Sequence, residues 1–264
     1  MPEGDTIARV AQVLGPALLG QRLVDVRFAH EAGAERILGG VVDAIDTHGK
    51  HLLVGVRAAE AWTLHVHLGM TGAWHLYPRG ARWRRPVREL TGLLATADRE
   101  AVCFAAPTFT LARAGSPVIA DPIARLGPDL LDPAFDPAAI AEVAASQGER
   151  PVCDVLLDQR IAAGIGNIYK NELLFYFRLH PGGPAGALPA STWAAIYAKA
   201  AALLAANLGP GGRRTSEDPR PGHALWVYGR AGRPCPRCGL PLIEAPWGQP
   251  PRVTCWCPRC QPER

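Results

Sequence analysis

Residues 235–238 of this 264-residue chain read Cys-Pro-Arg-Cys, and residues 257–260 read the same four letters. One Cys-x-x-Cys pair can wrap one edge of a tetrahedron, so two pairs supply the four thiolates of a structural Zn²⁺ site. The segment around them is too short to fold without such a metal. We therefore expect one structural zinc ion with no open position for catalysis. Its expected ligands are Cys235, Cys238, Cys257 and Cys260.

Basic charge is concentrated in the same segment. From Pro219 to Arg264 there are seven arginines and two acidic residues, a balance of +5 in a chain whose total is +4. Positive charge gathered on one segment is typical of phosphate binding. Charge alone leaves a solubilising tail as the alternative.

The remaining cysteines are not expected in the metal site. Cys103 and Cys153 have apolar neighbours and are expected to be buried, and Cys255 belongs to neither Cys-x-x-Cys pair. No apolar run approaches the roughly 20 residues of a membrane span, and the first residues lack the pattern of a signal peptide. We expect a cytoplasmic protein without a membrane partner, in which paired cysteines bind metal rather than form disulfides.

The chain begins with a helical pattern and continues with β-rich segments. Ile7, Leu14 and Leu18 recur at helical spacing up to Gly20, and Gly15-Pro16 is expected to kink or shorten that helix. Short apolar segments separated by turns follow, and such spacing is typical of a β-sandwich or flattened barrel. The predicted strands are 22–28, 41–47, 52–56, 62–67, 73–77, 89–96, 101–104 and 109–112.

The pattern becomes helical after Asp121-Pro122. We predict an α+β protein whose N-terminal β-sandwich with flanking helices (1–122) is followed by a helical domain (123–218) and a β-hairpin zinc finger (219–264). The arginine-rich stretch 79–88 is interpreted as a solvated loop. The predicted helices of the second domain are 137–146, 152–158, 167–179 and 190–208.

The first residues offer the means for covalent chemistry. Removal of Met1 would leave Pro2 with a secondary α-amine, and an α-amino group has an unperturbed pKa of about 8. Such an amine can form a Schiff base with a carbonyl group or a sugar C1′, and Glu3 beside it can transfer protons. Taken alone, Pro2 and Glu3 are more typical of an ordinary helix start.

Two further motifs can each be interpreted either as part of a binding site or as an ordinary structural feature. Lys50 follows Gly49 in a tight turn, where a lysine is commonly a solvated charge. The glycine-rich turn before Asn167 opens a helix, so that its backbone N–H groups form an anion site to which Asn167 can donate. The alternative is that Asn167 is a simple N-cap.

Seven segments together resemble one known family over essentially the whole chain. They are MPEGDT (1–6), GKHLL (49–53), HVHLGMTGAW (65–74), DPIARLGPDLL (121–131), LLDQRIAAGIGNIYKNELLF (156–175), WVYGRAGRPCPRCG (226–239) and WCPRCQ (256–261). In this order they resemble the formamidopyrimidine-DNA glycosylase / endonuclease VIII family of base-excision repair, and the start resembles its endonuclease VIII branch. The family fold is a β-sandwich, a helix–two-turn–helix domain and a zinc finger.

The resemblance implies a bifunctional DNA glycosylase and DNA-(apurinic or apyrimidinic site) lyase. It would remove oxidised bases from damaged double-stranded DNA and then cleave the strand by β- and δ-elimination. Pro2 would be the nucleophile at C1′ and Glu3 the general acid and base. Lys50 would hold phosphate and assist the lyase step, and Arg252 would assist elimination. A monomer in a bacterial-type cytoplasm, associated with the nucleoid through DNA binding, is also implied.

Contacts with DNA are implied for five further residues. Met70 resembles the apolar wedge that fills the space left by a flipped base. The DNA backbone would be contacted by His67, Arg125, Asn167 and Tyr228.

Three local features favour oxidised pyrimidines as substrates. Glu3 is followed by Gly4-Asp5-Thr6 rather than by the purine branch's Leu-Pro-Glu. Residues 106–109 lack that branch's arginine pair, and the loop 215–223 is short. A glycosylase for oxidised purines is the alternative, because the His-Leu-Gly-Met motif and the zinc finger resemble both branches. A non-catalytic protein that binds damaged DNA is a lesser alternative, because it would need neither Pro2 nor Glu3.

Overall fold

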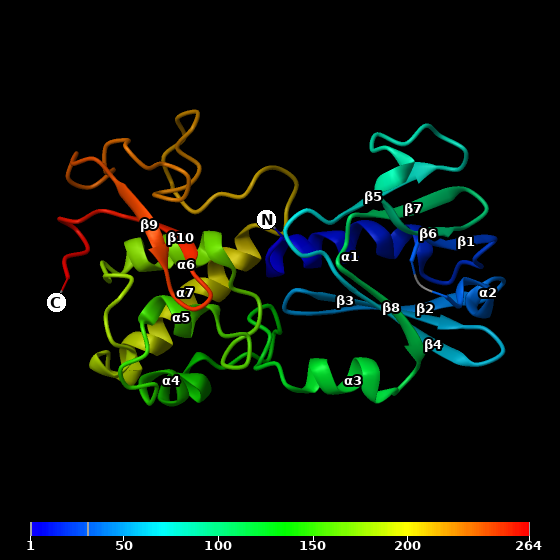
Figure 1. The fold of residues 1–264 in the computed structure, drawn as a ribbon, viewed down its shortest axis with the longest axis horizontal. Coiled ribbons are helices and arrows are strands. Elements are labelled where there is room, and N and C mark those ends of the chain that lie inside the picture. Colours follow the sequence, from blue (N-terminus) through cyan, green and yellow to red (C-terminus); the bar gives the residue numbers. More distant parts are fainter. Residues whose placement is uncertain (1, 31, 264) are drawn as a thin grey trace. The chain divides into compact units, whose positions relative to one another are not determined.

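The structure is a computed structural model that describes residues 2–30 and 32–263. Contacts between residues divide the chain into two compact units, Met1–Arg125 and Leu126–Arg264 (Figure 1). Each unit has a hydrophobic core of its own. The zinc-finger segment and the helical segment fall in the same unit, and their finer division at residue 218 stays a prediction.

The first unit opens with helix α1 (Gly4–Leu18). Ile7, Leu14 and Leu18 are buried on its inner face, as their spacing predicts, and the helix packs against strand β2 (Val41–His48). The expected shortening at Gly15-Pro16 does not occur. Pro16 lies inside the last turn, where the loss of one backbone N–H costs a single hydrogen bond near a helix end.

Two antiparallel four-stranded sheets form the sandwich of this unit (Figure 1). All eight predicted strands are present, with bounds that differ by up to three residues. In order across the first sheet they are β1 (Asp25–Phe28), β6 (Leu90–Ala95), β7 (Arg99–Phe104) and β5 (Ala73–Pro78). The second sheet contains β2, β3 (His51–Arg57), β4 (Ala61–His67) and β8 (Thr108–Arg113).

Alternation along the strands places the core on one face of the second sheet. Leu52, Val54 and Val56 of β3 are buried, while the residues between them belong to the other face. Gly92 of β6 lies directly against the ring of Phe109 in β8, where a Cβ atom would be 2.1 Å from Phe109 Cζ. The two sheets can therefore pack closely at this point only because residue 92 has no side chain.

Three short elements of the first unit were not predicted. They are α2 (Ala34–Ile37), the 3₁₀ helix η1 (Val87–Glu89) and α3 (Pro117–Ala124). The first two have too few residues to display a period. Helix α3 does carry a start signal, because Ser116 is its N-cap and Pro117 its first residue.

The second unit contains all four predicted helices and a hairpin. The helices are α4 (Pro137–Ala145), α5 (Val152–Leu157), α6 (Asn167–Tyr176) and α7 (Ala190–Ala206), with a 3₁₀ turn η2 (Ala185–Ala187) before α7. The hairpin consists of β9 (Ile243–Trp247) and β10 (Arg252–Trp256). Trp193, Tyr197 and Tyr169 are the largest side chains of the helical core. Within the described residues, no helix combines the length and apolarity required to cross a membrane.

Candidate active site and metal centre

Glu3 and Pro2 lie at the start of helix α1. Glu3 is the N-cap of the helix and is completely buried, and its backbone N–H donates to Thr6 Oγ1 at 3.4 Å. Pro2 precedes it and is half-buried. A buried carboxyl group next to the second residue of the chain is suited to proton transfer at a group attached to that residue. Met1 lies outside the described residues, so its removal stays a prediction.

Lys50 lies in the two-residue turn between β2 and β3. His48 and His51 pair across this turn, and Gly49 has a φ of +56°, a conformation that glycine adopts without steric cost. Lys50 is half-buried beside this glycine. The turn therefore fixes the backbone that carries the lysine.

His67 ends strand β4 opposite His51, and their ring centroids are 4.9 Å apart. Burial and the nearby charge of Lys50 both lower the pKa of His67, so the structure brings Lys50 and His67 together. The Nδ1 atom of His67 accepts a bond from Gly69 N at 3.3 Å, which places the proton of the neutral ring on Nε2. His67 can then donate to a phosphate oxygen from Nε2.

Met70 and Arg125 are exposed in the first unit. Met70 lies in the turn that follows β4, with 63% of its surface accessible. Met70 is therefore not a core residue, although a core position is the ordinary one for a methionine at a strand end. Arg125 is the C-cap of α3 and is exposed.

In the second unit, Asn167 and Arg252 lie close together. Asn167 is the first residue of α6, and its Nδ2 atom donates to the carbonyl oxygen of Val253 at 2.9 Å. Val253 follows Arg252, which is exposed at the first position of β10. The alternative that Asn167 is a simple N-cap is wrong, because Gly166 is the N-cap. The side chain of Asn167 bonds instead to the strand that carries Arg252.

Two further polar side chains of α6 bind the same strand. Lys170 Nζ donates to Thr254 Oγ1 at 2.6 Å, and Asn171 Oδ1 accepts from Cys255 N. Lys170 and Asn171 are both completely buried. Three consecutive residues of β10 are therefore bound by side chains of one helix.

Glu172 organises the segment that contains Tyr228. Its buried carboxylate accepts from the backbone N–H groups of Trp226, Val227 and Tyr228 at 2.7–3.0 Å and from the hydroxyl of Thr215. Our sequence analysis missed Glu172, Lys170 and Asn171. Their signal is a run of polar residues inside an otherwise apolar helix, NIYKNELLF.

The four predicted metal ligands lie together. Their Sγ atoms are all within 4.8 Å of one another, with 3.9 Å between Cys235 and Cys260 and 3.4 Å between Cys238 and Cys257. Tetrahedral Zn²⁺ with Zn–S bonds of about 2.3 Å requires sulfur–sulfur separations of about 3.8 Å. The cluster therefore fits a four-thiolate metal site, and no other cluster of this kind is found among the described residues.

Cys255 is outside this cluster, as expected. It is buried in a small hydrophobic cluster with Phe175, Val227 and Leu242. Burial raises the pKa of its thiol to about 11, and its sulfur is not among the four that lie within 4.8 Å of one another.

Three of the arginines counted toward a basic tail have internal roles. Arg237 donates to the carbonyl oxygens of Phe175 and Tyr176 at the end of α6 and lies 4.2 Å from the Phe175 ring. Arg230 is buried and donates to two backbone carbonyls, and Arg220 pairs with Asp218. Of the described arginines in this segment only Arg230 is buried, so most of the positive charge stays at the surface, including that of Arg233, Arg252 and Arg259.

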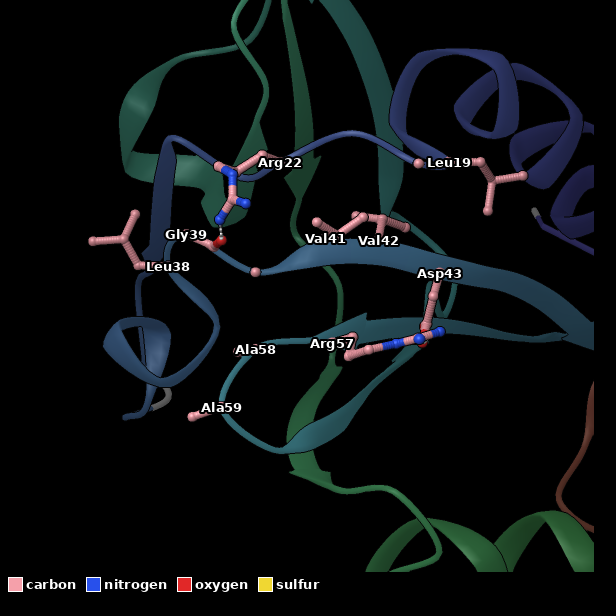
Figure 2. Close-up of a pocket in the computed structure, with 12 residues that line it drawn as sticks. Leu19, Arg22, Leu38, Gly39, Val41, Val42, Asp43, Arg57, Ala58 and Ala59 are labelled. Atoms are coloured by element: carbon pink, nitrogen blue, oxygen red, sulfur yellow. Dashed lines mark hydrogen bonds and ion pairs between the residues drawn. The ribbon is translucent and has the colours of Figure 1, made fainter.

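One large cavity of the first unit lies away from these residues. It has a volume of about 940 Å³ and lies where β2 begins and β3 ends (Figure 2). Lys50 lies at the opposite end of that hairpin. Its two arginines are committed, since Arg22 donates to Gly39 O and Arg57 pairs with Asp43 (Figure 2). The cavity therefore lacks a free acid–base pair and is not the candidate active site.

Comparison with known proteins agrees with this arrangement. Residues 1–108 match the formamidopyrimidine-DNA glycosylase N-terminal domain, and residues 126–218 match the formamidopyrimidine-DNA glycosylase H2TH domain. The chain belongs to the formamidopyrimidine-DNA glycosylase family. The two matched ranges do not include the β9–β10 hairpin or the four cysteines, which nevertheless lie together in this structure.

Three similar proteins illustrate the breadth of this family. The DNA-(apurinic or apyrimidinic site) lyase Nei2 of Mycolicibacterium smegmatis is 41% identical over 99% of both chains. The crystal structure of MutM (Fpg) from Thermus thermophilus is 31% identical over the full length of both chains, with a TM-score of 0.80. A Lactococcus lactis Fpg mutant in complex with Fapy-dG-containing DNA is 23% identical, covers 99% of this chain and 100% of that one, and has a TM-score of 0.82, which shows the shared fold.

Proposed function

We propose that this chain is a bifunctional DNA glycosylase and DNA-(apurinic or apyrimidinic site) lyase that removes oxidised bases from double-stranded DNA. One observation supports this above all. In this chain, which belongs to the family, the buried carboxyl group of Glu3 directly follows Pro2 at the start of a helix. The similar M. smegmatis protein is named as a lyase of this kind. A protein that only binds damaged DNA has no use for this pair.

In the proposed reaction the α-amine of Pro2, exposed by loss of Met1, attacks C1′ of the damaged nucleotide. The C1′–N bond to the base breaks, and Glu3 supplies the proton that assists opening of the sugar ring. The resulting Schiff base makes the C2′ protons acidic. Loss of one of them breaks the C3′–O bond by β-elimination, and a following δ-elimination breaks the C5′–O bond.

The remaining site residues hold the DNA, and two of them, Lys50 and Arg252, would also assist the elimination steps. Lys50 and the Nε2–H group of His67 are placed to bind phosphate oxygens from the first unit. Asn167, Arg252 and Tyr228 offer donors on the second, and Arg125 is an exposed cation at the end of α3. Contacts with phosphate carry no sequence information, which suits an enzyme that must find damage anywhere. Met70 would fill the space left by the extruded base.

A Zn²⁺ ion held by the four cysteines would have a structural role, because four thiolates leave no position for water. Its contribution is to fix the β9–β10 hairpin and therefore Arg252. A monomer located with the DNA in the cytoplasm is consistent with this activity and stays a prediction.

Oxidised pyrimidines are the substrates we favour. Residues 106–109 contain no arginine, and Phe109 is buried in the sandwich, so this segment offers no cation to the base opposite the lesion. The identity of 40% over 99% of this chain to a Streptomyces coelicolor protein named probable endonuclease 8 2 supports the same preference. Oxidised purines remain the alternative, because a solved purine-branch structure is 31% identical over the whole chain.

Borohydride trapping on two labelled duplexes tests this proposal. One duplex carries thymine glycol and the other carries 8-oxoguanine opposite cytosine. We expect a covalent adduct mainly with thymine glycol. We expect no adduct from protein with a blocked N-terminus, and a slower adduct from Pro2→Gly, which keeps an α-amine. Glu3→Gln should lose the adduct with an intact lesion but retain more of it with a preformed abasic site.

The same experiment separates the alternatives. A preferred adduct with 8-oxoguanine would overturn the pyrimidine preference and keep the mechanism. Trapping by the blocked protein would exclude Pro2 as the nucleophile. Binding without an adduct on lesion and abasic DNA would favour a damage-binding protein without catalysis.

A further inference from the structure

The turn formed by residues 68–72, which carries Met70, is closed by two local hydrogen bonds. Gly72 N donates to Leu68 O at 2.9 Å, and Gly69 N donates to His67 Nδ1 at 3.3 Å. Gly69 has a φ of +58°, and a Cβ atom there would lie 2.6 Å from the ring of Pro107. Pro107 therefore packs against the base of this turn, which we call the Met70 turn.

Arg85 reaches the Met70 turn from the arginine-rich stretch 79–88. Its Nη1 atom donates to the carbonyl oxygen of Thr71 at 3.2 Å. Its Nε and Nη2 atoms lie 2.8 and 2.6 Å from Glu89 Oε2, and its guanidinium lies over the ring of Phe104 at 5.4 Å. Both edges of the guanidinium are thus occupied, one by Glu89 and the other by the residue next to Met70.

Glu89 extends the same arrangement to the connection between β7 and β8. Its backbone carbonyl accepts from Ala105 N at 2.8 Å, two residues before Pro107. The Arg85–Glu89 pair therefore contacts the Met70 turn directly and the Pro107 connection through the backbone of Glu89. These are the two segments that meet at Gly69.

The stretch 79–88 is itself anchored, contrary to our interpretation of it as a solvated loop. Trp83 Nε1 donates to Glu100 Oε2 at 2.8 Å, and the backbone N–H of Arg84 donates to the Tyr77 hydroxyl at 3.0 Å. The side chains of Arg82, Arg84 and Arg88 do fit the earlier interpretation, because these residues are exposed. Arg85 has a different environment, with 25% of its side chain exposed.

We propose that Arg85 is a positioning residue for the wedge: together with Glu89 it clamps the Met70 turn so that Met70 is presented to the base stack in a fixed orientation. This inference rests on the proposed function, in which Met70 replaces the extruded base. A turn that had to become ordered during insertion would lose conformational entropy at that step. The clamp removes this cost before DNA binds.

Three variants distinguish a clamp from a simple phosphate-binding arginine. Arg85→Ala removes the clamp and one positive charge. Glu89→Gln weakens the clamp but removes a negative charge, which would strengthen phosphate binding if electrostatics were the whole effect. Arg84→Ala is the matched control, because it removes the same charge from an exposed neighbour.

The measurement is the rate of base extrusion in a duplex with 2-aminopurine beside thymine glycol, followed by stopped-flow fluorescence. A clamp predicts that Arg85→Ala and Glu89→Gln both slow this step by roughly ten- to a hundred-fold, the usual effect of a small misplacement. Arg84→Ala should leave the rate unchanged. Borohydride trapping on a single-stranded abasic oligonucleotide, which needs no wedge, should be the same for all variants.

Each other outcome has a definite meaning. Slowing by Arg85→Ala without slowing by Glu89→Gln would overturn the clamp in favour of phosphate binding. Reduced single-strand trapping by Arg85→Ala would overturn it in favour of general damage to the unit. Met70→Ala tests the underlying assignment: if this variant extrudes the base at the normal rate, the wedge role in the proposed function fails. If only Met70→Ala is slow, the wedge stands and the clamp fails.

Discussion

His51 is surrounded by other imidazole rings at the end of the β2–β3 hairpin. Its Nδ1 atom lies 2.8 Å from His65 Nε2, and its ring lies 4.9 Å from that of His67. Burial lowers the pKa of His51 to about 3, with further contributions from the charges of His67, His65, His48 and Lys50. The pKa values of His65 and His67 are also lowered, mainly by burial. The folded unit therefore holds this cluster neutral.

This cluster predicts how stability depends on pH. An unfolded histidine titrates near pH ~6.5, so between that pH and about 3 the unfolded chain binds the proton that folded His51 does not. The free energy of unfolding should fall as the pH is lowered from 7 to 4, with at most about 1.4 kcal/mol per pH unit from this residue. Urea unfolding at several pH values should show a shallower dependence in His51→Gln. Equal slopes in the two proteins would contradict the prediction.

The hairpin β9–β10 is held in place by side-chain contacts with the helical part of the second unit. Asn167, Lys170 and Asn171 of α6 bind residues 253–255 of β10. On β9, Trp247 packs against the helical core and against Gly182, where a Cβ atom would lie 2.3 Å from Trp247 Cζ3. Arg252, the first residue of β10 and the partner of Trp247 across the hairpin, therefore lies in a hairpin that is held through both of its strands.

A single methyl group at residue 182 should disturb this packing. In Gly182→Ala the added methyl group would clash with the Trp247 ring. Overpacking of this kind usually lowers the free energy of unfolding by about 1–3 kcal/mol. Gly183→Ala is the matched control, because the nearest atom to its Cβ would be His180 O at 3.4 Å. We expect a lower thermal midpoint and weaker DNA binding for Gly182→Ala only. The same midpoint for both variants would show that Trp247 moves aside without cost.

For the whole molecule, the proposed chemistry and the metal site lie in different compact units. Pro2, Glu3 and Lys50 belong to the first unit, whereas the four cysteines belong to the second. In the proposed function, residues of each unit contribute phosphate contacts, because the reacting nucleotide must be held out of the stack. Loss of the metal should therefore abolish the reaction on duplex DNA, although the metal has only a structural role.

Zinc analysis of two cysteine variants tests this expectation. The wild-type protein and Cys255→Ala should each contain one zinc ion per chain by elemental analysis. Cys238→Ser should lose the metal and the adduct with duplex DNA, while adduct formation with a single-stranded abasic oligonucleotide should be less affected. Full zinc content in Cys238→Ser, or loss of zinc in Cys255→Ala, would contradict the ligand set.

The sequence by itself determined the features that repeat locally. Strand alternation, helical spacing and the Cys-x-x-Cys pairs depend on residues near one another in the chain, and the eight strands, four helices of the second unit and metal cluster agree with them. The candidate roles of Pro2, Glu3 and Lys50 came instead from the resemblance of the whole chain to one family, because each local motif alone is more typical of an ordinary helix start or turn. Short elements such as α2 were not predicted, because four residues are too few to show a helical period.

Only the tertiary structure decided the partners of individual polar side chains. Glu172 and Thr215 lie 43 residues apart, as two polar residues with no shared motif, yet they bond in the buried interior. Arg85 and Arg84 are adjacent and chemically identical, but only the side chain of Arg85 reaches Thr71 and Glu89. A guanidinium has the same charge in either place. Which arginine becomes a clamp and which stays in solvent depends on the direction of its Cβ and on the carbonyls within reach, and both are set by the folded chain.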